Sequence, residues 1–354
     1  MTGLSKIWSE GPVIWFGLFY YFIVFLKVLT MENTYPQKAP PSSNLKLRIR
    51  SVWRHGDPIF FGLILGAALL VIALVLAIAY ELWQNSSLAR QAFGFGFLTT
   101  ATWDPNLGRQ FGALPFIMGT LVTSLLAIVL AVPIGLGAAI FLAELAPEWL
   151  RSPLGLLVEL LAAIPSVVYG LWGLFAFIPQ VVKPASEWMS QTFGFLSIFQ
   201  GPVYGPSRLA AALILTIMIL PTVTAISRDV LRAIPNSQRE AGFALGSTQW
   251  EMLSKILIPY GLSGILGAAI LGLGRALGET MAVTMVIGNN LDLSASLLHP
   301  GYTMASIIAN EFTEATYDLY LHALIEIGLI LFVMTLVINL IARLLIWRVA
   351  QKLA

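Results

Sequence analysis

The chain has 354 residues, of which 58% are hydrophobic and 11% charged, and its formal net charge at pH 7 is +2. A soluble domain carries roughly 25% charged residues, so this composition predicts a membrane protein. The small net charge argues against a nucleic-acid partner, and the absence of cysteine excludes disulfides, thiol catalysis and Cys-based zinc sites. The three histidines, His55, His299 and His322, are scattered, so we expect neither a metal site nor a cofactor.

The N-terminal part precedes the first clear membrane span. Residues 12–26 form a short apolar run that ends at Lys27 and either spans the membrane or lies at its interface. The run lacks the basic start and cleavage site of a signal peptide, and Met31 is an alternative start of the protein. Residues 32–44 are rich in proline and serine and predict a linker. We divide the chain into an N-terminal segment (1–57), a first span with its outer loop (58–114) and a transmembrane domain (115–350).

Six apolar runs are long enough to cross a membrane, since a helical span needs about 20 apolar residues. The expected fold is an all-α membrane protein with six core helices, and an additional helix over the N-terminal run is the open alternative. Proline interrupts three spans and glycine recurs in others, which indicates close helix packing or a path through the bundle. The expected spans are 58–83, 115–143, 154–178, 207–226, 260–287 and 321–347.

Lysine and arginine gather in three regions: residues 38–54, a polar loop at residues 228–258, and residues 343–352 at the C-terminus. Six spans place all three regions on one side of the membrane, which the positive-inside rule identifies as the cytoplasm. Residues 289–320 contain no lysine or arginine, so this loop is expected outside. It is our candidate for contact with an external partner.

The polar loop carries helix signals of its own. Ser237-x-x-Glu240 and Thr248-x-x-Glu251 both match the capping box of a helix N-terminus. Gly246 lies between them, where a glycine that ends a helix is expected. The pattern predicts a short helix, a glycine turn and a second short helix, which is suited to docking on another protein. For Glu240, capping alone is the alternative to capping combined with partner contact.

Two charged residues occupy the fifth span. Arg275 lies near its centre, where a lone arginine costs on the order of 2.5–3.5 kcal/mol on insertion scales. Glu279 follows one turn later, so the two side chains can share a helix face. Either they form a structural ion pair within the bundle, or they form a polar site on a solute path where Arg275 binds an anion. Glu159 and Glu326 lie nearer span ends, where carboxylates can reach the interface.

Motifs for catalysis are missing from the sequence. There is no Gly-Lys dipeptide, hence no phosphate-cradling Walker A loop, and no His-Glu-x-x-His motif. We therefore expect that the chain is not an enzyme and that a gradient or a separate ATPase drives any active transport. An intramembrane enzyme is disfavoured because no nucleophile–base constellation appears.

The polar loop resembles the cytoplasmic EAA loop of ABC importer permeases. The family pattern has a second alanine where this chain has Gly242, and a leucine where it has Ile258. The resemblance implies a type I, MetI-like permease bundle whose EAA loop contacts the ATPase. The residues that match the motif are Glu240, Ala241, Gly242, Gly246, Ile256 and Pro259.

From about residue 103 to 348, the chain resembles the C subunit of Pst-type phosphate importer permeases, most specifically in residues 111–124, 159–170 and 271–282. This resemblance implies ATP-driven import of inorganic phosphate across the bacterial inner membrane, with Arg275 and Glu279 lining the path. It also implies a second related permease subunit, two copies of a cytoplasmic ATPase and an extracytoplasmic phosphate-binding protein. Membrane lipid would surround the spans.

Two alternatives stay open. A permease for another oxyanion, such as sulfate, molybdate or phosphonate, would share the EAA loop and differ only in the fifth span. A gradient-driven secondary transporter would have no reason to carry a doubly capped cytoplasmic loop, and its uptake would not need an ATPase.

Overall fold

The computed structural model describes residues 57–106 and 108–353. In these ranges the regular elements are all helices, which confirms the expected all-α fold. Contacts divide the chain into two units, Met1–Gln84 and Asn85–Ala354, and each is described by itself. The short apolar run at 12–26, the alternative start at Met31 and the linker lie outside the described residues.

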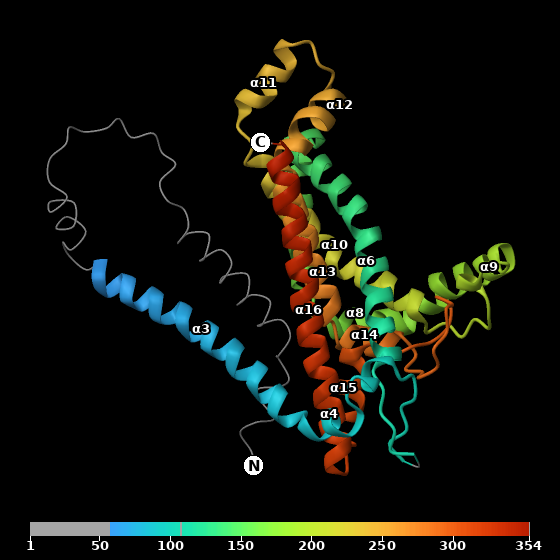
Figure 1. The fold of residues 1–354 in the computed structure, drawn as a ribbon. Coiled ribbons are helices and arrows are strands. Elements are labelled where there is room, and N and C mark those ends of the chain that lie inside the picture. The colour runs from blue at the N-terminus through green and yellow to red at the C-terminus, as the bar shows by residue number, and fades with distance from the viewer. Residues whose placement is uncertain (1–56, 107, 354) are drawn as a thin grey trace. The chain divides into compact units, whose positions relative to one another are not determined.

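The described part of the first unit is a single long helix, α3 (Asp57–Asn85), which is blue in Figure 1. Its 29 residues rise about 43 Å at 1.5 Å each, more than the hydrocarbon thickness of a bilayer. Its sequence is apolar on all sides over most of its length, as in a helix that faces lipid. It corresponds to the first expected span.

The second unit is a helical bundle in which the polar loop and the helices α4 and α15 lie at opposite ends (Figure 1). In chain order its helices are α4 (Ser87–Phe93), α5 (Gly96–Thr99), α6 (Leu114–Ile140), η1 (Phe141–Leu145), α7 (Glu148–Ala163), α8 (Ser166–Trp172), η2 (Gly173–Val182), α9 (Lys183–Phe193), η3 (Ser197–Phe199), α10 (Arg208–Arg232), α11 (Asn236–Ala244), α12 (Gln249–Met252), η4 (Leu253–Leu257), α13 (Ile258–Gly278), α14 (Met281–Val286), α15 (Met304–Glu311) and α16 (Asp318–Leu353). The elements η1, η2 and η4 are π-helices, and η3 is a 3-10 helix.

Six helical stretches in the described residues are long and apolar enough to cross a membrane, in agreement with the expected number. Four of them match the predicted spans closely, namely those at 58–83, 115–143, 207–226 and 321–347. The third and fifth predictions were wrong in detail because each apolar run contains a helix break.

Helix α10 is the most buried span and packs against α6 and α13. Glycine allows this close approach on both sides. A Cβ added to Gly135 of α6 would lie 3.0 Å from Val223 Cγ1, and one added to Gly272 of α13 would lie 3.0 Å from Val223 Cγ2. These glycines therefore serve packing, since a side chain at either position would push the helices apart.

The third predicted span, 154–178, crosses a break. Helix α7 ends at Ala163, Ile164 and Pro165 have extended backbones, and α8 begins at Ser166. Pro165 has no backbone N–H to continue the ladder and disfavours a helical conformation at Ile164. The membrane-length helix is instead Ser166–Phe193, formed by α8, η2 and α9.

The fifth predicted span, 260–287, is also interrupted. Helix α13 ends at Gly278, and Glu279 has an extended backbone with ψ 127° before α14 begins at Met281. By contrast, Pro133 and Pro221 lie inside helices α6 and α10, which continue past them. A proline alone therefore does not determine where a membrane helix breaks.

The end of the bundle opposite the polar loop is held by buried polar contacts. Trp103 Nε1 and Tyr320 Oη both donate hydrogen bonds to Glu311 Oε2, at 2.7 and 2.6 Å. At Gly119 a Cβ would lie 1.9 Å from the carbonyl oxygen of Tyr302, so only glycine fits there. This contact gives part of the Pst-like stretch 111–124 a structural role.

Candidate functional site

The polar loop folds into the two short helices that its sequence predicts, α11 and α12. The second capping box is confirmed: Glu251 N donates to Thr248 Oγ1 at 3.3 Å, and Thr248 N donates to Glu251 Oε2 at 3.2 Å. The prediction of a first capping box, at Ser237 and Glu240, was wrong. Helix α11 begins one residue before Ser237, after Pro235, and no side chain caps it. The proline starts the helix early and places Ser237 inside the first turn.

Gly246 ends α11 as expected. Its φ of +78° lies in the left-handed region, which disfavours β-branched residues. The turn is closed by two backbone hydrogen bonds, from Gly246 N to Phe243 O at 2.9 Å and from Ser247 N to Gly242 O at 3.2 Å. These are the paired bonds of a Schellman motif.

Gly242 is buried and faces the second half of the loop. A Cβ at this position would lie 2.8 Å from Ile256 Cδ1 in η4. Two residues of the EAA-like motif therefore contact each other, and Ile256 fills the space that the alanine of the family pattern would need. Pro259 lies in the first turn of α13, where its missing N–H has no intrahelical partner to lose.

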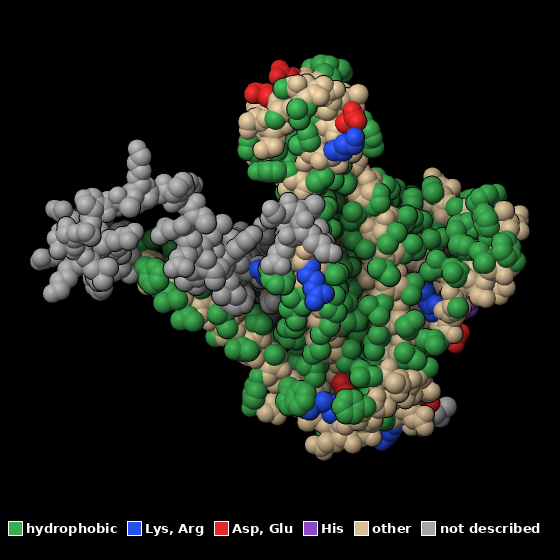
Figure 2. Space-filling model, turned by 45° about the horizontal axis from the view of Figure 1, so that its top comes forward, with side chains coloured by type: hydrophobic (Ala, Val, Ile, Leu, Met, Phe, Trp, Pro, Cys, Tyr) green, Lys and Arg blue, Asp and Glu red, His purple; other side chains and the backbone are tan. Residues whose placement is uncertain are grey.

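The loop exposes several large apolar side chains. Phe243, Leu245 and Trp250 are 50%, 88% and 72% exposed. Glu240 and Ala241 are exposed nearby, and the side chain of Glu240 has no hydrogen bond or ion pair within the described part of the chain. Figure 2 shows apolar surface among the acidic side chains of this lobe. Exposed apolar residues that are grouped on a polar segment are typical of a protein-docking surface.

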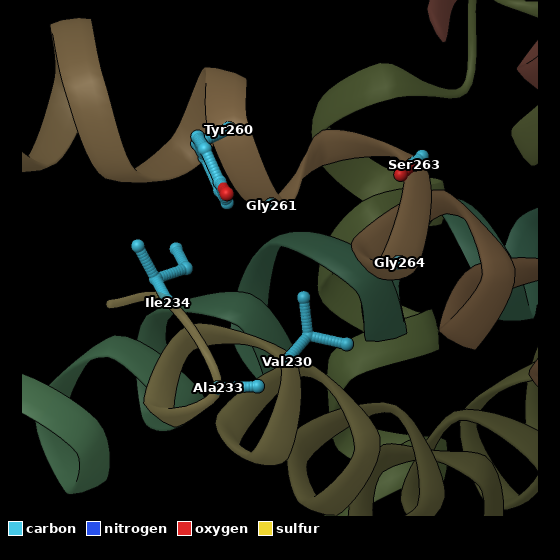
Figure 3. Close-up of a pocket in the computed structure, with 7 residues that line it drawn as sticks. All are labelled: Val230, Ala233, Ile234, Tyr260, Gly261, Ser263 and Gly264. Carbon is cyan, nitrogen blue, oxygen red and sulfur yellow. The ribbon is translucent and has the colours of Figure 1, made fainter. Parts of the chain in front are cut away.

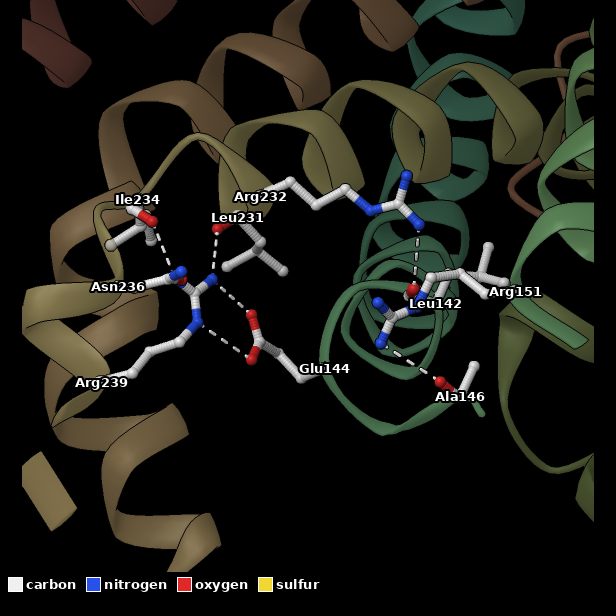
Figure 4. Close-up of polar contacts among 9 residues, drawn as sticks. All are labelled: Leu142, Glu144, Ala146, Arg151, Leu231, Arg232, Ile234, Asn236 and Arg239. Atoms are coloured by element: carbon white, nitrogen blue, oxygen red, sulfur yellow. Dashed lines mark hydrogen bonds and ion pairs between the residues drawn. The ribbon is translucent and has the colours of Figure 1, made fainter. Parts of the chain in front are cut away.

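An arginine that the sequence analysis counted only as a positive charge anchors the loop. Arg239 of α11 donates from Nη2 to Glu144 Oε1 at 2.6 Å and from Nε to Glu144 Oε2 at 3.2 Å (Figure 4). It also donates to the carbonyl oxygens of Ile234 and Leu231, at 2.7 and 2.9 Å. Glu144 belongs to η1, which extends α6, so one side chain connects α11 to the ends of α6 and α10.

Two further arginines bind carbonyls at the same end of the bundle. Arg232 donates to Leu142 O at 3.3 Å, and Arg151 donates to Ala146 O at 3.2 Å (Figure 4). The last carbonyls of a helix lack intrahelical donors and carry partial negative charge, so cations stabilise them. The end of α6 and η1 is therefore surrounded by positive charge.

A small pocket of about 170 Å³ lies beside this anchor, between the end of α10 and the start of α13 (Figure 3). It contains no charged side chain, so it is unsuited to an anion. On its floor the two helices still pack closely, since a Cβ at Gly264 would lie 2.6 Å from Val230 Cγ2. The residues that line it are Val230, Ala233, Ile234, Tyr260, Gly261, Ser263 and Gly264.

The charged residues of the fifth span do not form an ion pair in the described part of the chain. Arg275 Nη1 donates to Thr222 Oγ1 of α10 at 3.1 Å. Glu279 Oε1 accepts from Ala282 N in the first turn of α14 at 3.2 Å. Because α13 ends before Glu279, the one-turn spacing that would have placed both side chains on one helix face does not apply.

The two helix breaks lie close together, since α8 packs against α14. A Cβ at Gly170 of α8 would lie 2.7 Å from Met285 Sδ and 3.1 Å from Ala282 Cα. The Glu279 carboxylate also interacts with the hydroxyl of Ser166, the first residue of α8. Two of the Pst-like stretches, 159–170 and 271–282, thus meet at the breaks, beside Arg275. Breaks in membrane helices are tolerated where they are buried in protein or line a path.

The other two membrane carboxylates have different environments. Glu159 is exposed and pairs with Arg228 of α10 at 3.1 Å. Glu326 was expected to reach the interface, but it is buried in α16 with 6% exposure. Neither residue contacts Arg275 in the described part of the chain.

Comparison with solved structures defines the class of fold. The chain superposes on a bacterial alginate ABC transporter, solved in complex with an alginate pentasaccharide-bound periplasmic protein, with a TM-score of 0.56 at 18% identity. The match covers 87% of this chain and 99% of that one. The fold is therefore that of an ABC importer permease.

The sequence comparisons narrow the class to a family. Residues 131–353 match the model of the binding-protein-dependent transport system inner membrane component, and the chain belongs to this family. The phosphate transport system permease protein PstC of Mesorhizobium japonicum is 47% identical over 84% of this chain and 91% of its own length. That of Pasteurella multocida is 47% identical over 80% of this chain and 88% of its own. These relatives confirm the resemblance to Pst-type permeases, and the chain is a multi-pass inner-membrane protein.

Proposed function

We propose that this chain is the permease subunit of an ATP-driven importer of inorganic phosphate. The observation that carries the proposal is the 47% identity over 84% of the chain to a phosphate permease. A second, related permease would complete the path, because one bundle supplies only half of its wall. An external phosphate-binding protein would deliver the anion.

The polar loop would couple the bundle to one of two copies of a separate ATPase. The other copy would bind the corresponding loop of the second permease. Its exposed Phe243, Leu245 and Trp250 supply apolar surface for a partner groove, and Glu240 supplies an unpaired charge beside them. Closure of the ATPases on ATP would move the loop and switch the bundle from inward-facing to outward-facing. The lysine and arginine bias of the loops supports a cytoplasmic position for the polar loop and the C-terminus.

Arg275 would meet the phosphate inside the membrane. A guanidinium has five N–H donors, and one of them is used on Thr222, which leaves others for an anion. Glu279 would act as a positioning residue that holds the junction of α13 and α14 by accepting from Ala282 N. In this arrangement it does not compete with phosphate for Arg275.

The test is uptake into proteoliposomes that contain both permeases, the ATPase and the binding protein, with phosphate and sulfate compared. We expect ATP-dependent uptake of phosphate and little uptake of sulfate. A preference for sulfate would favour a permease for another oxyanion. Phosphate uptake without the ATPase subunit would favour a gradient-driven transporter.

A further inference from the structure

We infer that the ion pair between Arg239 and Glu144 is the link that passes movement of the polar loop to the membrane helices. The inference rests on the proposed ATP-driven function and assigns a positioning role to a pair that does not touch the substrate. It names the side chains that hold α11 to α6 and α10, whereas the EAA-like motif names only the surface that meets the ATPase.

The geometry of the pair suits a rigid connection. Two parallel N–H···O contacts, at 2.6 and 3.2 Å, join the guanidinium of Arg239 to the carboxylate of Glu144. Such bidentate pairs fix orientation as well as distance. Their side chains are only 17% and 10% exposed, so solvent and salt screen the pair little.

The same loop contains a natural comparison. Lys255 and Glu251 form an ion pair at 2.9 Å, but their side chains are 72% and 40% exposed. Exposed pairs of this kind contribute little to stability because water and salt screen them. This pair joins two residues one helical turn apart in α12 and η4, which follow each other directly in the chain, so it provides a matched control.

Arg239 also holds the end of α10. Its remaining N–H groups donate to the carbonyls of Leu231 and Ile234, in the last turn of α10 and just beyond it. Both carbonyls lie at the end of the helix, where backbone acceptors have few intrahelical donors, and Leu231 O also accepts from Ile234 N at 3.3 Å. If α11 moves while these bonds persist, the ends of α6 and α10 must move with it.

The connection reaches the proposed phosphate site through one helix. Helix α10 carries Leu231 at the anchored end and Thr222 further along, and Thr222 accepts the hydrogen bond of Arg275. A continuous series of contacts therefore runs from α11 through Arg239 and α10 to Arg275. Coupling between distant sites requires such a physical connection or an equivalent shift of a two-state element.

The experiment measures the phosphate transported per ATP hydrolysed in the fully reconstituted complex. We expect Arg239→Gln and Glu144→Gln each to lower this ratio roughly tenfold, because each removes the charge-assisted pair. The ratio for Arg239→Lys should fall between those of these variants and the wild type, since lysine keeps the charge but cannot donate two parallel hydrogen bonds to the carboxylate. The control Lys255→Gln should stay within about twofold of the wild type. The double variant should be no worse than the more affected single variant if the two residues act as one pair.

If the pair has a purely structural role, its loss should lower assembly, melting temperature, phosphate transport and ATP hydrolysis in parallel, and the phosphate transported per ATP should stay unchanged. That result would overturn the inference. An unchanged ratio of phosphate transported to ATP hydrolysed in well-assembled Glu144→Gln and Arg239→Lys would also overturn the inference. These two variants decide the test if Arg239→Gln fails to assemble. If the wild-type complex showed no ATP-dependent uptake, the proposed function itself would fail, and the two failures are thus distinguishable.

Discussion

The two ends of α10 are each held by an arginine, but in different ways. At the start of the helix, buried Arg208 donates to the carbonyl oxygens of Ser294 and Asp292. Backbone bonds from Arg208 N to His299 O, at 3.2 Å, and from Leu209 N to Leu297 O, at 2.9 Å, reinforce this end. No carboxylate takes part in these contacts.

The other end depends on charge. Arg239 binds a carboxylate on a different helix, and a small pocket lies beside it. The start of α10 is thus fastened in part by backbone hydrogen bonds that no side-chain exchange removes. The contacts described at its end come from side chains, and a single substitution removes the pair between Arg239 and Glu144. From this difference we expect the Arg208 end of α10 to stay fixed and the end beside Arg239 to be movable.

The largest effect should come from Arg275, between the two ends. Arg275→Gln removes the intramembrane cation, and we expect phosphate uptake in proteoliposomes to fall at least a hundredfold while the complex still assembles. Lys183→Gln, which removes an exposed cation from α9, is the control and should retain most of the uptake. If Arg275→Gln transported normally, the residue would have no part in the path.

The next effect concerns the movable end. Gly246→Val forces a β-branched residue into the left-handed region, which costs on the order of 1–3 kcal/mol. We expect the variant to lose the ATPase in co-purification or to hydrolyse ATP without transport. Gly246→Asn should be milder because asparagine tolerates this conformation. Full coupling in the valine variant would contradict the proposed role of the turn.

The fixed end should show the opposite behaviour. Arg208→Gln removes charge-assisted hydrogen bonds to the carbonyls of Ser294 and Asp292, at a cost of roughly 3 kcal/mol. This loss should lower the melting temperature of the purified complex by about 5–10 °C. The phosphate transported per ATP should stay near the wild-type value in molecules that remain folded. A lower value of phosphate transported per ATP would show that the start of α10 also transmits movement.

The smallest effect separates the two predicted capping boxes. Thr248→Ala removes an observed cap, and we expect it to destabilise the start of α12 by about 1 kcal/mol, seen as faster amide exchange in residues 249–252. Ser237→Ala should change exchange in α11 little, because Ser237 caps nothing. Equal effects of the two variants would mean that Ser237 does cap α11.

The features predicted correctly from the sequence are those determined locally. The Gly246 turn and the Thr248 cap depend on neighbours within a few residues, and span length depends on composition. The capping box predicted at Ser237 was wrong because Pro235, two residues earlier, occupies the N-cap position and the helix begins at Asn236. Proline was expected to interrupt three spans, but the helix ends only at Pro165, and the other two prolines lie inside unbroken helices.

Long-range partners could not be predicted. Arg239 and Glu144 are 95 positions apart in the chain, and nothing in either local sequence indicates the other. The spacing of Arg275 and Glu279 suggested a shared helix face only as long as α13 was assumed to continue. The break after Gly278 gave each residue a different neighbour, Thr222 for one and Ala282 for the other.

If its start stays fixed while its end moves, α10 acts as a lever that pivots at Arg208. A tilt of about 10° around that point would displace Thr222, some 21 Å along the helix, by roughly 4 Å. The 3.1 Å hydrogen bond from Arg275 to Thr222 could not follow so large a shift unless α13 moved as well. The same movement of the polar loop would then break this bond and free one more N–H donor of Arg275 for the anion.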